Sequence, residues 1–289
     1  MTTAQTPAPT STPTAPSRVS RSTRRRSTQW SLPRAGGGCV KAGIGQVGLW
    51  RAPIQAYGVE RTARLLSDAG LTVTSLCRGG FLTALDPAER VRALDDNRRA
   101  VDEAAAVATD TLVLVSGGLP PGSRDLYGAR ERVAEALAEL APYAAERGVR
   151  LAIEPLHPMF ASDRCVVSTL AQALDLAERF PAERVGVVVD TYHLWWDDRA
   201  PAEIARAGAG GRIHAFQLAD WITPLPAGVL LGRGQLGDGS VDFRAFRAAV
   251  EAAGYDGPIE VEIFNEALWA RDGAEVLAEV AARYGQHAC

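Results

Sequence analysis

Lysine is almost missing from this sequence of 289 residues: of its 31 Lys and Arg residues, only Lys41 is a lysine. Enzymes that form a Schiff base with a substrate, or with pyridoxal phosphate, need a lysine amine beside the reacting carbon. Lys41 lies in a segment with a helical pattern and not at the end of an apolar run. The sequence therefore argues against both of these chemistries.

Cysteine is also sparse, with four residues. Cys39, Cys77, Cys165 and Cys289 lie far apart, without the Cys-x-x-Cys pairs of a zinc knuckle or the dense spacing of a disulfide framework. We therefore expect reduced thiols and a cytoplasmic protein. No apolar run reaches the 18 residues that indicate a transmembrane helix, so we expect no membrane association.

Acidic residues are missing from the start of the chain. The first 35 residues contain six Arg and no Asp or Glu, whereas the whole chain has a formal charge of -3. The remainder is thus acidic, which argues against a surface that neutralises nucleic-acid phosphates.

Residues 1–17 are rich in Thr, Ser and Pro and bury too little to fold, so we predict a disordered tail there. A single domain is expected over residues 18–289.

Beyond Trp30, short apolar runs alternate with segments of helical pattern, which indicates βα units around a parallel sheet. Seven runs are typical of strands: 44–50, 71–76, 111–116, 150–155, 185–190, 213–220 and 258–264. The predicted α/β fold is a (β/α)8 TIM barrel, which needs one more strand. The only candidate, Arg18–Thr23, alternates poorly, so we expect a weak or irregular first strand. An open doubly wound sheet is less consistent, because its Gly-rich phosphate loop is absent.

Four of these runs end near a side chain that carries oxygen: Glu154, Asp190, Gln217 and Glu262. Because side chains alternate along a strand, each can face the barrel interior, and all four then converge at the carboxyl end. Carboxylates at close range repel one another unless a cation neutralises them. Hard oxygen ligands favour Mg²⁺ or Mn²⁺ over Zn²⁺. The alternative is that some of these carboxylates are solvated residues at loop edges.

The histidines are interpreted by their position along the strands. His214 stands three residues before Gln217, so it faces the opposite side of the strand, and we interpret it as structural. His193 and His157 each follow a predicted ligand by three residues and are placed to hydrogen-bond a substrate. Three residues just past two earlier strands are expected to wall the pocket: Trp50, Arg51 and Phe81.

Five motifs occur in a fixed order: Glu-Pro-Leu-His-Pro (154–158), Val-Asp-Thr-Tyr-His (189–193), Gln-Leu-Ala-Asp-Trp (217–221), Gly-Arg-Gly-Gln-Leu-Gly-Asp-Gly (232–239) and Ile-Glu-Val-Glu-Ile-Phe (259–264). Together they resemble the sugar phosphate isomerase/epimerase family of the xylose isomerase-like barrels, over about residues 30–284. Many members carry His where this chain has Gln217, whereas hydroxypyruvate isomerase-like members are similar to it in carrying Gln. The resemblance implies one divalent ion held at the positions of Glu154, Asp190, Gln217 and Glu262.

The resemblance also implies a function. A sugar or sugar phosphate would be isomerised or epimerised by proton abstraction beside a carbonyl, through a metal-stabilised enediolate. Glu154 and Glu262 are the expected acid/base pair. His193 and Arg233 would contact substrate oxygens or a phosphate, with Arg233 on a mobile Gly-rich loop. A homo-oligomer is a further expectation from the resemblance.

Two kinds of alternative remain open at this site. An inosose dehydratase or a hydroxypyruvate isomerase-like enzyme would use the same residues. A catalytically silent, metal-free binding barrel would keep the carboxylates for structural reasons alone. A multi-zinc DNA-repair endonuclease of the same fold is disfavoured, because its site needs several histidines and the chain has four in all, of which His287 is terminal.

Overall fold

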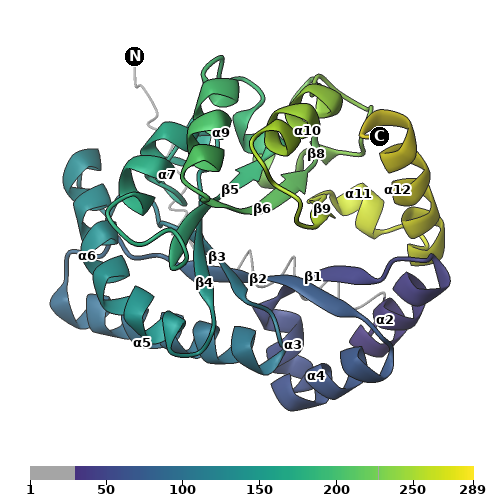
Figure 1. Ribbon diagram of the computed structural model, residues 1–289, viewed down its shortest axis with the longest axis horizontal. Coiled ribbons are helices and arrows are strands. Elements are labelled where there is room, and N and C mark those ends of the chain that lie inside the picture. The colour runs from purple at the N-terminus through teal and green to yellow at the C-terminus, as the bar shows by residue number, and fades with distance from the viewer. Residues whose placement is uncertain (1–29, 227) are drawn as a thin grey trace, which may run out of the picture.

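A computed structural model describes residues 30–226 and 228–289, and it shows a parallel sheet curled into a barrel with helices outside it (Figure 1). The seven strands of this sheet follow one another in chain order: β1 (Gln46–Trp50), β2 (Thr72–Gly80), β3 (Thr111–Val115), β4 (Arg150–Glu154), β5 (Val185–Asp190), β6 (Ile213–Leu218) and β9 (Ile259–Val261). The predicted α/β barrel is confirmed. Two further short strands, β7 (Asp220–Trp221) and β8 (Arg233–Gly234), pair antiparallel with each other.

Helices connect the strands and cover the outside of the sheet. They are α2 (Leu32–Lys41), α3 (Arg51–Tyr57), α4 (Val59–Asp68), α5 (Pro87–Ala106), α6 (Leu126–Ala145), α7 (Leu170–Ala177), α8 (Thr191–Leu194), α9 (Ala200–Ala209), α10 (Phe243–Ala252), α11 (Glu266–Trp269) and α12 (Gly273–His287), with 3₁₀ turns at Pro158–Phe160 and Val229–Leu231. Several begin at a capping carboxylate. Asp86 and Asp125, for example, accept hydrogen bonds from backbone N–H groups in the first turns of α5 and α6.

One layer of small side chains fills the barrel interior. It consists of Cys77, Val113, Ala152, Val188 and Ala215, with Trp50 packed against it. Three of these residues, on β4, β5 and β6, stand two positions before a predicted ligand. Because alternate residues of a strand share a face, the layer places those ligands on the interior face as well. The larger apolar core lies between the sheet and the helices.

A seam separates β1 from β9 in the described part of the chain. These two strands are not hydrogen-bonded to each other, although a Cβ at Gly48 would lie only 3.3 Å from the carboxylate of Glu260. Outside the seam, α2 packs against α12 (Figure 1). A cavity of about 560 Å³ extends along it. The predicted first strand, Arg18–Thr23, and the predicted tail, residues 1–17, lie outside the described residues.

The last residue of α2 is Lys41, whose side chain is exposed. Because α2 leads into the amino end of β1, this residue lies at the end of the barrel opposite the predicted ligands. Among the residues described, no helix combines the length and apolar character needed to cross a membrane.

Candidate active site

Four oxygen-bearing side chains meet at the carboxyl end of the barrel. Glu154 ends β4, Asp190 ends β5 and Gln217 is the second-to-last residue of β6, while Glu262 directly follows β9. Asp190 and Gln217 are partners in the β5–β6 register, and Glu154 and Glu262 flank them on the neighbouring strands. Glu154, Asp190 and Gln217 are each at most 3% exposed. The structure thus brings together the four residues that strand phase predicted.

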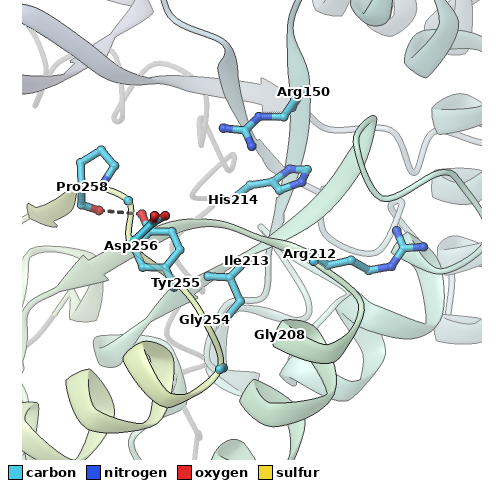
Figure 2. Close-up of a pocket in the computed structure, with 12 residues that line it drawn as sticks. Arg150, Gly208, Arg212, Ile213, His214, Gly254, Tyr255, Asp256 and Pro258 are labelled. Atoms are coloured by element: carbon cyan, nitrogen blue, oxygen red, sulfur yellow. Dashed lines mark hydrogen bonds between the residues drawn. The ribbon is translucent and has the colours of Figure 1, made fainter.

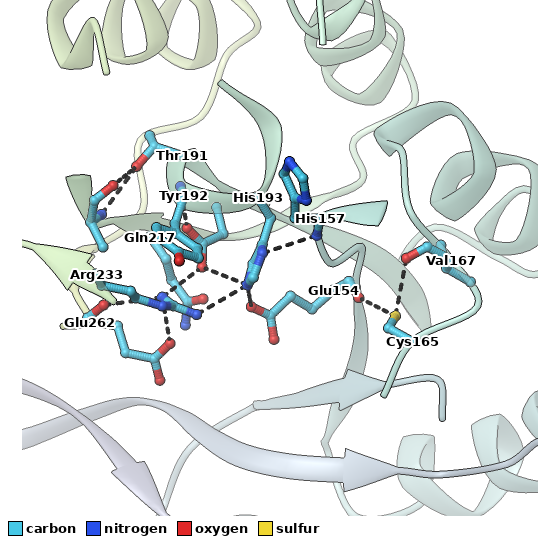
Figure 3. Close-up of polar contacts among 12 residues, drawn as sticks. Glu154, His157, Cys165, Val167, Thr191, Tyr192, His193, Gln217, Arg233 and Glu262 are labelled. Atoms are coloured by element: carbon cyan, nitrogen blue, oxygen red, sulfur yellow. Dashed lines mark hydrogen bonds and ion pairs between the residues drawn. The ribbon is translucent and has the colours of Figure 1, made fainter. Parts of the chain in front are cut away.

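The guanidinium of Arg233 lies among these carboxylates (Figure 3). Its Nη1 donates to Oδ2 of Asp190 over 3.0 Å and to Oε2 of Glu262 over 3.1 Å. The side chain of Arg233 is 5% exposed, so these charge-assisted bonds are shielded from water. Arg233 was expected to contact substrate; in the structure it binds two predicted metal ligands and offsets part of their charge.

Asp220 fixes the loop that carries Arg233. Its buried carboxylate accepts hydrogen bonds from four backbone N–H groups, those of Trp221, Gly237, Gly239 and Val241. A Cβ at position 239 would lie 2.0 Å from the backbone oxygen of Trp221, so only glycine allows this close approach. The Gly-rich motif therefore builds a support for Arg233 that is anchored by hydrogen bonds to Asp220.

His193 brings its imidazole ring to the same site. The backbone N–H of His157 donates to its Nδ1 over 3.1 Å, and Nη2 of Arg233, which can only donate, lies 3.1 Å from its Nε2. Burial lowers the pKa of His193 well below its usual value, and Arg233 lowers it further. Its Nε2 lies 3.8 Å from a carboxylate oxygen of Glu154 and 3.8 Å from one of Asp190, and these three residues could hold a cation together. A neutral imidazole has one lone pair, so it can accept from only one of the two donors that face it.

Gln217 contributes an amide oxygen that accepts no hydrogen bond from any residue that the structure describes. Its Nε2 donates to Glu260 over 2.7 Å. An unsatisfied buried acceptor is unfavourable by about 1–3 kcal/mol, and a bound cation would satisfy it. Together with the carboxylates of Glu154, Asp190 and Glu262, this oxygen makes a hard donor set that fits Mn²⁺ or Mg²⁺. The site residues thus fit a divalent ion.

Glu260 was not singled out from the sequence, although a signal was present. It stands two residues before Glu262 and therefore shares its strand phase. In the sheet it is the register partner of Gln217. A second carboxylate on the interior face of β9 was thus predictable, but its partners were not.

Glu154 is the carboxyl group best placed to hold a proton. Burial raises its pKa well above the usual range, and the negative charges of Asp190 and Glu262 raise it further. Burial also raises the pKa of Asp190, but the neighbouring Arg233 opposes that change. A carboxyl group with a raised pKa in a cleft is suited to acid/base work near neutral pH.

The predicted pocket walls differ in where they lie. Trp50 reaches the site, because its Nε1 donates to Oε1 of Glu262 over 3.1 Å. The ring of His157 packs against Trp196 and Trp221 beside His193. Phe81 directly follows β2, is 37% exposed and lies under the guanidinium of Arg78.

Arg51 is not brought to the site. It begins α3, and its guanidinium forms ion pairs with Asp96 and Glu103 of α5. Its side chain is therefore held between helices outside the sheet, because two carboxylates on one face of α5 are within its reach. The expectation that Arg51 walls the substrate pocket is corrected by this placement.

A second pocket, of about 240 Å³, lies at the amino ends of the strands (Figure 2). Arg150, His214 and Tyr255 are among its lining residues. The Nε2 of His214 lies 3.0 Å from the backbone oxygen of Ala182. The structure therefore places His214 away from the four converging oxygen donors, as its strand phase indicates.

We expect His214 to reduce stability in acid. Burial, with help from the charge of Arg150, lowers its pKa to about 4, whereas the unfolded chain titrates near 6.5. When the pH lies between these two pKa values, His214 is protonated in the unfolded state and neutral in the folded state. The free energy of unfolding therefore falls as the pH drops from 6.5 towards 4, by an amount on the order of 3 kcal/mol.

The variant His214→Gln cannot titrate, so it should show a shallower loss of stability than the unmodified chain over that pH range. Urea unfolding measured at intervals between pH 6.5 and 4 reports this slope. If the free energy of unfolding fell equally steeply with pH in the two proteins, His214 would not be the cause of the loss of stability in acid.

Comparison with known proteins identifies the family. Residues 35–280 match the model of the xylose isomerase-like TIM barrel. The chain therefore belongs to this family, as the five ordered motifs predicted.

Individual relatives agree with this assignment. A crystal structure of a protein from Sinorhizobium meliloti 1021 is similar with a TM-score of 0.87 and 45% identity, covering 92% of this chain and 95% of that chain. The 3-dehydroshikimate dehydratase of Pseudomonas aeruginosa is 35% identical over 180 residues, which are 61% of this chain and 26% of that enzyme. This chain thus spans about a quarter of the dehydratase. The L-ribulose 3-epimerase of Methylomonas sp. is 26% identical over 225 residues, 77% of this chain and 70% of the epimerase.

Proposed function

We propose that this protein is a divalent-metal-dependent sugar isomerase or epimerase. The observation that carries the proposal is the convergence, at the carboxyl end of the barrel, of three carboxylates and an amide oxygen that has no partner among the described residues. Active sites of TIM-barrel enzymes lie at this end. The similarity to an L-ribulose 3-epimerase supports a sugar as the substrate class.

A divalent cation would supply one thing to the reaction, namely stabilisation of the negative charge that develops on the substrate oxygens as a proton leaves. Glu154, Asp190, Gln217 and Glu262 would hold this cation. Their hard oxygen atoms support Mn²⁺ or Mg²⁺ over Zn²⁺.

The carboxylates of Glu154 and Glu262 would move the proton. They come from β4 and β9, with β5 and β6 between them, so they approach a substrate from two sides. One carboxylate would remove the proton beside the carbonyl and keep it, and the other, protonated beforehand, would donate its own proton to the neighbouring carbon or to the opposite face. The raised pKa of Glu154 suits it to be the carboxyl group that starts protonated.

Arg233 and His193 would orient the substrate. Nη2 of Arg233 lies 3.1 Å from Nε2 of His193, and in the tautomer whose Nδ1 accepts from His157 both groups are donors. Two donors that face each other are both satisfied when one oxygen accepts from them. A substrate carbonyl or hydroxyl oxygen would fill that role, and its developing charge would strengthen both bonds.

Deuterium uptake tests this proposal. We expect the Mn²⁺-loaded protein to introduce deuterium from heavy water into at least one compound of a panel of ketoses, inososes and hydroxypyruvate, measured by mass spectrometry. Protein treated with a chelator should introduce none, and adding Mn²⁺ should restore exchange. No ion binding and no exchange with any compound would favour the silent binding barrel.

Dehydration is the second candidate, favoured by the 35% identity to a dehydratase over 180 residues. Loss of water from a hydroxyl β to a carbonyl begins with the same proton abstraction, so the same two carboxylates would serve. The deuterium assay separates the two reactions. A dehydratase yields a product lighter than its substrate by one water, whereas an isomerase or epimerase conserves composition.

A further inference from the structure

Glu260 lies inside the barrel next to Gln217 and is held there by three side chains. Its Oε2 accepts the hydrogen bond from Nε2 of Gln217 over 2.7 Å. Its Oε1 accepts from the hydroxyl of Ser75 over 2.7 Å and from the hydroxyl of Thr74. Gly48 of β1 leaves the room for this carboxylate, because a Cβ there would lie 3.3 Å from it.

These contacts fix which way the amide of Gln217 points. A carboxylate can only accept hydrogen bonds, so the NH₂ group of the amide must face Glu260. The oxygen then points the other way. Oε1 of Gln217 is buried and has no hydrogen-bond partner among the residues described, and Figure 3 shows Gln217 beside Arg233 and His193. Without Glu260, nothing in these contacts would distinguish this orientation from the flipped one.

The flipped amide would present its NH₂ group to the cluster of Glu154, Asp190 and Glu262. That group donates to carboxylates and repels a cation. The orientation of the amide therefore decides whether Gln217 offers an oxygen ligand to the cation or repels it. Replacing a residue that hydrogen-bonds a metal ligand and orients it commonly lowers metal affinity by about 10- to 100-fold.

We propose that Glu260 is a positioning residue that holds the amide oxygen of Gln217 towards the divalent cation. Together, Glu260 and Gln217 would make the site prefer ions that bind oxygen ligands. The proposal rests on the metal-dependent function proposed above. Glu260 would act through Gln217 and not through the substrate. It makes position 217 a neutral oxygen ligand where an imidazole would be a nitrogen ligand that favours Zn²⁺.

The first test is Glu260→Gln, which keeps the shape of the side chain but lets it donate as well as accept. The orientation of Gln217 is then no longer fixed. We expect the dissociation constant for Mn²⁺, measured by calorimetry on chelator-treated protein, to rise by about 10- to 100-fold. Glu203→Gln is the matched control, because Glu203 is a buried carboxylate of α9 paired with Arg199 and Arg206. It should leave Mn²⁺ affinity unchanged.

The second test is Gln217→His, which remains informative if Glu260→Gln does not fold. One ring nitrogen can donate to Glu260 while the other offers its lone pair to the ion. We expect the ratio of Zn²⁺ to Mn²⁺ affinity to rise. Pulsed EPR of the Mn²⁺-loaded variant should show coupling to a ¹⁴N nucleus that is weaker or missing in the unmodified protein.

The outcomes separate the two proposals. If the unmodified protein binds neither Mn²⁺ nor Mg²⁺, the proposed metal-dependent function fails. If it binds Mn²⁺ and folded Glu260→Gln binds it equally well, the positioning role of Glu260 is overturned while the function stands. If Gln217→His shows neither a changed ion ranking nor new nitrogen coupling, position 217 is not a ligand and the inference is also overturned.

Discussion

Replacing Glu154 or Glu262 with glutamine is expected to reduce turnover by about 100- to 10,000-fold, the range that positioned acid/base groups contribute. Glutamine keeps an oxygen donor at the same distance from the backbone, but it cannot accept a proton. Ion affinity should therefore fall only modestly, since one ligand charge is lost while the number of oxygen donors is kept. Turnover of a substrate found in the deuterium assay and calorimetric Mn²⁺ binding report the two effects separately.

The two variants should also differ from each other. A substrate bound in one orientation presents its exchangeable proton to one carboxylate first, so one variant should lose deuterium exchange while the other keeps it. Glu279→Gln is a suitable control, because this residue of α12 pairs with Arg271 and Arg283 on the outer surface. Near-normal turnover in both site variants with an ion bound would show that the metal is structural and the mechanism wrong.

Replacing Arg233 with methionine should destabilise the ion-free protein by about 3–5 kcal/mol, the usual loss when one partner of a buried ion pair is removed. Methionine has a similar length but no charge, so the fully buried Asp190 and the partly buried Glu262 would lose the cationic side chain that now contacts both of them. Urea unfolding of chelator-treated protein measures this loss.

Bound Mn²⁺ would neutralise the same carboxylates, so the loss caused by Arg233→Met should shrink when the ion is present. Arg90→Met serves as the control, because Arg90 of α5 pairs with Glu135 of α6 on the outer surface. A surface pair of this kind contributes about 0–1 kcal/mol. An equal loss with and without Mn²⁺ for Arg233→Met would mean that the guanidinium and the ion do not act on the same charges.

The seven strands could be predicted from the sequence because each is a compact apolar run. β5 illustrates this, since Val185–Asp190 is apolar throughout and ends on a carboxylate, and its predicted and observed bounds agree. β2 was predicted too short, because its final residues include two glycines that carry no apolar pattern. Gly80 is needed there for packing: a Cβ at that position would lie 1.8 Å from the backbone oxygen of Val115.

The positions of the four site residues followed from strand phase, but their partners did not. Alternation places Gln217 and Glu262 on the interior face without knowledge of the neighbouring strands. The contact between Gln217 and Glu260 depends on the register of β6 against β9. The contacts of Arg233 depend on a loop that closes around Asp220. Both are properties of paired segments far apart in the chain, and local sequence pattern does not encode them.

The exposed side chain at the end of α2 has a practical consequence. Lys41 is the only lysine of the chain, and it lies at the end of the barrel opposite the converging carboxylates. Apart from the α-amino group of the chain, reagents that couple to primary amines can therefore react with just one side chain of this protein. A sensor surface or fluorescent dye attached at Lys41 would leave the carboxyl end of the barrel facing solution, so ion and sugar binding could be followed on the attached protein.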